Sequence, residues 1–171
     1  ITHKFPKPEV VFLNTSDILE GEVLISNYSD VEALPGQAKK SIRNGDILYS
    51  EIRPENKRFA YINFDADDYV VSTKLMVLRS TGLVDGLFPY FYLTRQSTID
   101  HLQNVAESRS GTFPQITFDQ IKELSIALPD VEQVKQFTEK YLRPNYELIF
   151  SDNSETGQLI ETRNYPDAKL I

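Results

Sequence analysis

Residues 110–129 carry the sequence SGTFPQITFDQIKELSIALP, and the expected organisation of the chain starts from this stretch. Ser110-Gly111-Thr112 predicts a loop, since small polar residues and glycine are typical of irregular segments. Thr117 and Gln120 have the spacing of a capping box, in which the two residues satisfy backbone N–H groups at the start of a helix. The first part of the stretch therefore predicts a loop that leads into a short helix.

A strand and a second helix are expected after this short helix. Every second residue is a large aliphatic one, which predicts a strand with one buried face, at Leu124, Ile126 and Leu128. Pro129 would end that strand, because proline cannot donate a hydrogen bond to a neighbouring strand. Asp130 and Gln133 then have the spacing that opens a helix.

The composition bounds the class of protein. The 171 residues are 40% hydrophobic and include 10 Phe and 9 Tyr, which is enough for the core of one ordinary domain. No apolar run approaches the ~20 residues that a membrane span needs, and Pro, Lys and Glu in the first ten residues exclude a signal-peptide pattern. The absence of cysteine excludes disulfides and thiolate metal ligands, and it fits a cytoplasmic protein.

The formal net charge of −7 does not favour a free-standing DNA-binding protein, whose surface is usually basic. Local patches matter more than the total, however, so the charge alone does not exclude nucleic acid. The chain begins with Ile1 rather than Met, which indicates an excised fragment of a longer protein.

The first half predicts a β-rich unit over about residues 10–80. Asn44-Gly45 is its sharpest turn signal, and a polar loop is expected from Arg53 to Arg58. The expected strands are residues 10–13, 23–25, 46–52, 59–64, 70–71 and 75–78.

The second half predicts helices. One is expected over residues 85–94, and a second would begin at a capping box formed by Ser97 and Asp100. A third has an apolar seam of Val131, Val134, Phe137 and Tyr141. Pro144 is expected to break this third helix, and the heptad-like spacing over residues 146–163 predicts a further helix beyond it.

Several segments together resemble one known family. They are GDILYSEIRP at residues 45–54, VVST at 70–73 with VLR at 77–79, LNTSDI at 13–18, and the stretch from residue 110 to 129. In this order they resemble a target recognition domain of the DNA specificity subunits of type I restriction–modification systems. Ala127 stands where that family often has proline.

The resemblance implies an α+β fold: a twisted β-sheet target recognition domain flanked by short helices and followed by a long C-terminal helix. It implies a recognition domain over residues 1–142 and a spacer, or dimerisation, helix over residues 143–171. A complete subunit carries two such halves, so this chain would be one half, or a half-length version that pairs with a copy of itself. Its interface with the other half is expected at Ile149, Thr156 and Ile160.

The resemblance also implies a protein that is not an enzyme and that needs no cofactor or metal. The expected partners are double-stranded DNA, methyltransferase modification subunits, a restriction/translocase subunit and the second half of the specificity subunit. The sequence agrees, because it contains neither the Asn/Asp-Pro-Pro-aromatic motif of adenine methyltransferases nor a phosphate-binding loop. His3 and His101 stand alone and predict no metal site.

Residues for DNA contacts are expected on loops held by a rigid sheet. Guanidinium and amide groups suit base edges, whereas amines and hydroxyls suit phosphates. The alternative for each residue is an ordinary solvated turn. The candidates are Lys39, Lys40, Arg43, Arg53, Asn56, Lys57, Arg58, Ser72, Lys74, Arg109, Ser110 and Thr112.

Two other functions stay open from the residues alone. Asp46 with Glu55 and Lys57 resembles the acidic pair and lysine that bind Mg²⁺ in many DNA-cutting nucleases, although Pro54 fits poorly beside such a strand. The acidic charge is also compatible with a protein-interaction domain that does not bind DNA.

Overall fold

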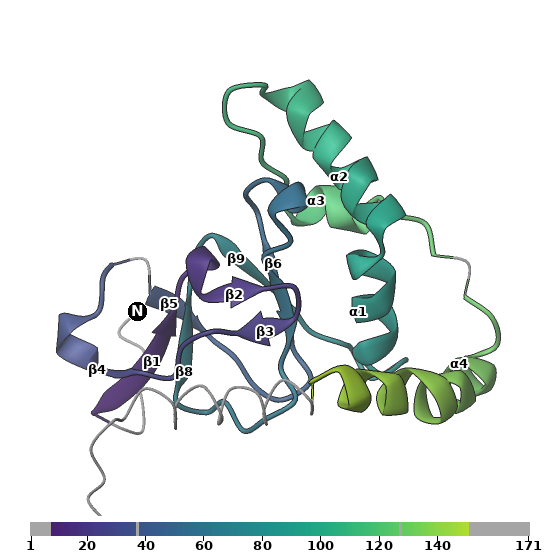
Figure 1. Cartoon of the computed structure of the whole chain (residues 1–171), viewed down its shortest axis with the longest axis horizontal. Helices are drawn as coiled ribbons and strands as arrows, with labels where there is room; N and C mark the ends of the chain where they lie inside the picture. The colour runs from purple at the N-terminus through teal and green to yellow at the C-terminus, as the bar shows by residue number, and fades with distance from the viewer. Residues whose placement is uncertain (1–7, 37, 127, 151–171) are drawn as a thin grey trace, which may run out of the picture.

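The computed structural model describes residues 8–36, 38–126 and 128–150. A β-rich part occupies the N-terminal half and a helical part follows it, with the last described helix running below α1 toward the edge of the β-rich part in the view of Figure 1. The predicted α+β class is therefore confirmed. No helix among the described residues is long and apolar enough to span a membrane.

The strands form three small sheets, with the orders β4-β1-β8-β5, β2-β3 and β7-β6-β9. β1 and β8 are parallel, and the other pairs are antiparallel. The strands are β1 Glu9–Leu13, β2 Ile18–Leu19, β3 Glu22–Val23, β4 Tyr28–Asp30, β5 Ala38–Ser41, β6 Ile47–Ser50, β7 Phe59–Tyr61, β8 Tyr69–Ser72 and β9 Leu75–Leu78.

The helices follow the strands in the chain. They are α1 Leu87–Thr94, α2 Gln96–Arg109, α3 Phe118–Lys122 and α4 Val131–Phe137, with 3-10 turns η1 Thr15–Asp17, η2 Val31–Ala33 and η3 Pro54–Asn56. α4 passes into a π turn, η4 Thr138–Leu142, and the helix then continues to Phe150.

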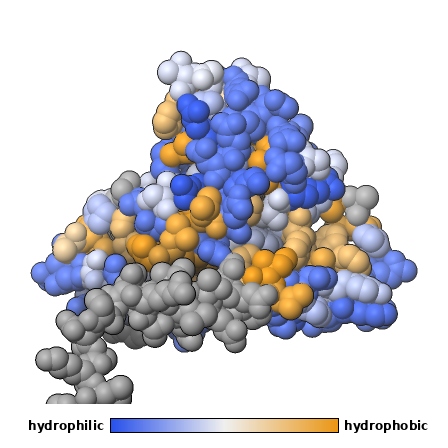
Figure 2. Space-filling view, viewed as in Figure 1, coloured by the Kyte–Doolittle hydropathy of each residue, from blue (hydrophilic) through white to orange (hydrophobic). Residues whose placement is uncertain are grey.

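Strand β6 lies between two hydrophobic cores. Ile47 and Tyr49 belong to the core that the helices cover, whereas Leu48 belongs to the core against the four-stranded sheet. Successive side chains of a strand point to opposite faces, so one short strand joins both cores and all its residues are buried. Figure 2 shows apolar side chains gathered where the β-rich part meets the helices, while the surface over α2 is mostly hydrophilic.

Two local predictions about helix starts had different outcomes. The capping box of α3 is confirmed, because the Gln120 side-chain oxygen accepts a hydrogen bond from the Thr117 backbone N–H at 2.8 Å. The capping box at Ser97 is wrong, since α2 already begins at Gln96. The Arg95 carbonyl accepts hydrogen bonds from the N–H groups of Thr98 and Ile99, so Arg95 occupies the capping position.

The strand predicted over residues 124–128 is wrong. The described residues of this segment belong to no strand, and Figure 1 shows them in the long connection from α3 to α4. The Tyr92 hydroxyl of α1 donates to the Ser125 carbonyl, so the segment lies beside a helix. Alternating apolar residues form a strand only where a neighbouring strand offers hydrogen bonds, and here a helix takes that place.

The break predicted at Pro144 is also wrong, because the helix continues through it to Phe150. Proline cannot donate to the carbonyl four residues back, and its ring crowds that carbonyl. The π turn directly before it widens the helix, and the Arg143 N–H donates to Thr138 five residues back.

The buried face of this helix differs from the one that the sequence predicted. Val134, Thr138 and Tyr146 are buried, whereas Phe137 is 47% and Tyr141 48% exposed. The expected division into residues 1–142 and 143–171 stays a prediction, since most of the second segment lies outside the described residues. Thr156 and Ile160 lie there too, and Ile149 is exposed on the helix.

We expect the stability of the protein to fall in alkaline solution. Burial raises the pKa of Tyr49, Tyr90 and Tyr146 well above the ordinary value of 10.0. The unfolded chain then releases tyrosyl protons at a lower pH than the folded chain, so stability is intact below about pH 10 and is lost above it. Urea unfolding midpoints between about pH 8 and about pH 11, followed beside tyrosinate absorbance, measure this. An unchanged midpoint would contradict the burial of these hydroxyls.

Candidate nucleic-acid interface

Two loops far apart in the sequence are joined at the C-terminal end of β6. The Arg53 N–H donates to the Pro114 carbonyl at 3.2 Å, and the Ile116 N–H donates to the Glu51 carbonyl at 2.9 Å. Ile52 and Gln115 form an isolated antiparallel bridge between them. The loop after α2 is therefore held against the sheet by its own backbone.

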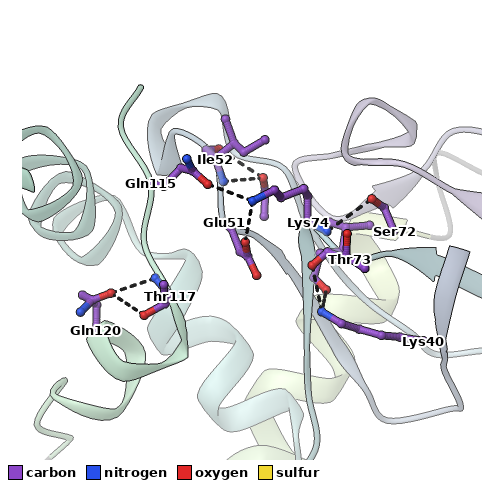
Figure 3. A network of polar contacts seen from close by, with 11 residues as sticks. Lys40, Glu51, Ile52, Ser72, Thr73, Lys74, Gln115, Thr117 and Gln120 are labelled. Atoms are coloured by element: carbon purple, nitrogen blue, oxygen red, sulfur yellow. Dashed lines mark hydrogen bonds and ion pairs between the residues drawn. The ribbon is translucent and has the colours of Figure 1, made fainter. Parts of the chain in front are cut away.

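Lys74, in the turn between β8 and β9, adds a third segment to this place. Its amine lies 3.4 Å from a Glu51 carboxylate oxygen and donates to the Gln115 side-chain oxygen at 3.1 Å (Figure 3). The Glu51 N–H donates in turn to the Lys74 carbonyl at 3.0 Å. We call Glu51–Arg53, Lys74 and Pro114–Ile116 the loop platform.

Lys40 and Ser72 hold the β8–β9 turn that carries Lys74. The Lys40 amine donates to the carbonyls of Thr73 at 3.0 Å and Leu75 at 2.8 Å, and burial lowers its pKa (Figure 3). The buried Ser72 hydroxyl accepts from the Lys74 N–H at 3.3 Å. Both residues thus fix the β8–β9 turn, a role that the sequence did not reveal.

Arg53 has an unusual backbone at the edge of the platform. Its φ of 43° is left-handed, which is rare for a residue with a side chain and costs free energy. Its guanidinium is partly exposed and lies 4.0 Å from the Glu55 carboxylate. Lys57 shares the left-handed conformation, with a φ of 52°, but its amine pairs with Glu20. Arg53 combines this strain with a place in the platform, which makes it a candidate for a DNA contact.

The loop after α2 projects from the platform. Its candidate residues Ser110 and Thr112 are exposed, and the Ser110 hydroxyl accepts from the Phe113 N–H at 3.2 Å. Arg109 donates to the Gln120 side chain. Phe113, which sequence reasoning missed, is 50% exposed. Its only signal was a large aromatic residue inside a polar loop.

Four other candidates are not part of the platform, although the Asn56 N–H donates to the Arg53 carbonyl at 2.9 Å. Lys57 pairs with Glu20 at 3.3 Å, and Arg58 donates to the carbonyls of Ser16 and Ile18 at 3.2 and 3.0 Å. Arg58 therefore braces the β2 region instead of extending into solvent, and Asn56 is exposed in η3. The last of the four, Arg43, lies at the opposite end of β6. The side chain of Lys39, in β5, is not described.

The residues of the suggested nuclease site are not brought together. Asp46 is fully buried just before β6 and accepts two hydrogen bonds of 2.7 Å from Arg79. Glu55 and Lys57 follow the other end of β6. Among the described residues no group of three acidic or histidine side chains could hold a metal ion. Arg79 was missed because its partner is 33 residues away.

The chain matches the family described as the type I restriction modification DNA specificity domain over residues 6–140, and it belongs to that family. The family description names DNA specificity and no catalytic activity. This chain is 51% identical over 126 residues to the type I restriction enzyme HindI specificity subunit of Haemophilus influenzae (strain ATCC 51907 / DSM 11121 / KW20 / Rd). That similarity covers 73% of this chain and 28% of the relative.

Two solved structures share the fold. One comes from a structural study of complex assembly and conformational transition of the type I R-M system, and its TM-score is 0.67. The other is the crystal structure of the HsdS subunit from Thermoanaerobacter tengcongensis, with a TM-score of 0.62. Each is 24% identical to this chain, and each similarity covers 97% of this chain and 46% of the other. This chain thus spans less than half the length of these proteins.

Proposed function

We propose that this domain recognises one part of a DNA target sequence and directs a type I restriction–modification complex to it. The loop platform carries this proposal, because three segments distant in the sequence are held rigidly side by side there. Sequence recognition requires hydrogen-bonding side chains held in a fixed geometry, and loops on a rigid sheet provide them. Membership of the DNA specificity family supports the same function.

Within the platform, Arg53 and Gln115 offer a guanidinium and an amide, the groups that form paired hydrogen bonds with base edges. Lys74 offers an amine that suits a phosphate. Ser110 and Thr112 offer hydroxyls on the projecting loop. We assign the remaining candidate at this end, Arg109, to the loop's orientation through Gln120.

The acidic chain requires partners to hold DNA tightly. With a net charge of −7 it neutralises few phosphates by itself, so binding to DNA alone is expected to be weak. We propose that methyltransferase modification subunits close around the duplex and that a restriction/translocase subunit joins the full complex. The second half of the specificity subunit, or another copy of this chain, would recognise the rest of the target.

The platform is tested by replacing Arg53 with alanine. The left-handed backbone strains alanine as much as arginine, so folding stability should hardly change. Loss of a base contact is expected to weaken target binding by about 1–3 kcal/mol and to relax the preference at one base pair. Binding is measured by fluorescence anisotropy on the complex with modification subunits, after methylation mapping of the source genome gives the target.

Lys122→Ala is the matched control, because Lys122 is an exposed cation on α3 outside the platform. Equal loss of binding with Lys122→Ala would assign the effect to general charge. Wild-type binding that does not distinguish the target from a scrambled duplex would refute the proposed function itself.

A further inference from the structure

A charged hollow of about 590 Å³ opens at the end of β6 that lies opposite the platform. It is bounded by the turn before β6, by the loop between β9 and α1, and by the C-terminal helix. The lining includes four cationic side chains and three carboxylates, which are Arg43, Arg79, Lys135, Arg143, Asp46, Asp85 and Glu139. A net positive hollow is notable in a chain whose total charge is −7.

All three carboxylates in the hollow already have cationic partners. Arg79 binds Asp46 with two hydrogen bonds of 2.7 Å. Arg143 lies 2.7 Å from Asp85 and 2.9 Å from Glu139. Two guanidinium groups thus pair with three carboxylates, and one negative charge is left over on the wall.

Two cations remain beyond these pairs. Arg43 and Lys135 are exposed, and no ion pair within the described part of the chain involves either side chain. They come from elements far apart in the sequence, the loop after β5 and α4, and both line the same hollow. Arg43 is fixed at its backbone, because its N–H donates to the Asp46 carboxylate at 2.9 Å.

The wall of the hollow also contains an unsatisfied hydroxyl. Thr138 lines the hollow and is 1% exposed, and its hydroxyl has no hydrogen-bond partner among the described residues. A buried hydroxyl without a partner costs free energy. Thr138 also opens the π turn, and such turns occur frequently at functional sites.

We infer that this hollow binds a phosphate of the DNA backbone, at a point separate from the loop platform. The inference rests on the proposed function, because DNA is the phosphate-bearing partner of this domain. Guanidinium and ammonium groups are the usual protein partners of phosphates, and they attract them regardless of base sequence. Contact at both ends of β6 would fix the orientation of the domain on the duplex.

The test uses the full chain with modification subunits and two fluorescein-labelled duplexes, one with the target and one scrambled. Arg43→Gln and Lys135→Gln each remove one free cation from the hollow, and both positions are exposed, so both variants should fold. The slope of log K against log salt concentration is negative. Each substitution is expected to reduce the size of this slope by about 0.9, the value for one phosphate contact. The loss should be equal for the two duplexes, because a phosphate contact carries no sequence information.

Lys140→Gln is the matched control, since Lys140 lies exposed on the same helix but does not line the hollow. Slopes that stay unchanged in Arg43→Gln and Lys135→Gln, or that fall equally in Lys140→Gln, would overturn the inference. If the slopes fall as expected while the wild type fails to distinguish the two duplexes, the phosphate site stands and the proposed recognition function fails. If the wild type distinguishes them and the slopes do not change, recognition stands and the phosphate site fails.

Discussion

Asp46→Ala is expected to lower the free energy of unfolding by about 3 kcal/mol, because it removes a buried acceptor from three donors at once. The Asp46 carboxylate has no exposed surface. It accepts two hydrogen bonds from Arg79 and one from the Arg43 backbone N–H, which ties the turn before β6. Urea unfolding followed by circular dichroism measures the loss.

Asp67→Ala is the control, since Asp67 is an exposed acidic residue in the turn before β8. It should change stability by less than about 0.5 kcal/mol. A double-mutant cycle with Arg79→Ala separates the ion pair from the turn contact. A loss below about 1 kcal/mol for Asp46→Ala would mean that the buried pair contributes little, and that β6 is anchored by its apolar neighbours.

Gly21→Ala is expected to destabilise the protein by about 3 kcal/mol, through backbone strain and overpacking together. Gly21 has a φ of 101°, where a side chain is strained. An added Cβ would lie 2.7 Å from the Tyr90 hydroxyl and would collide with the Phe150 ring. The expected result is therefore both lower stability and displacement of the helix end at Phe150 from the β2–β3 turn.

Gly82→Ala is a control for the backbone alone, because Gly82 has a φ of 93° with no atom within 4 Å of an added Cβ. It should cost about 1 kcal/mol. Phe150→Ala in the Gly21→Ala background should recover part of the stability, since it removes one collision. Equal losses in Gly21→Ala and Gly82→Ala would show that the helix end does not pack against Gly21.

Local patterns predicted the elements of this fold better than their pairing. The capping box at Thr117 and the strands around β6 depend on neighbouring residues, and they were predicted correctly. The pairing of β1 with β8 joins strands on either side of most of the β-rich part, and no local pattern specifies it. Residues 124–128 alternate as a strand would, but only a pairing partner distinguishes a strand from an extended loop.

The candidate site shows the same division. The sequence located the loops, and the structure brings Arg53, Lys74 and the segment after α2 together. The sequence could not show that the Lys40 amine donates to backbone carbonyls, or that Arg58 supports the β2 region. A cation in a polar loop has the same sequence pattern whether it faces solvent or binds a carbonyl, so its direction is set by long-range packing.

The π turn at Thr138–Leu142 makes the C-terminal helix sensitive to length in a particular way. Such a turn holds one residue more than an α-helical turn, and one residue corresponds to about 100° of rotation around the axis. A regular α-helix through all of these residues would turn Tyr146, whose hydroxyl donates to the Tyr61 carbonyl, away from the sheet. Deleting one residue from the π turn would restore a regular helix and leave Tyr146 on the face that it has now. An insertion at this position would thus change the angle of the following helix more than its distance, whereas a single deletion would keep that angle.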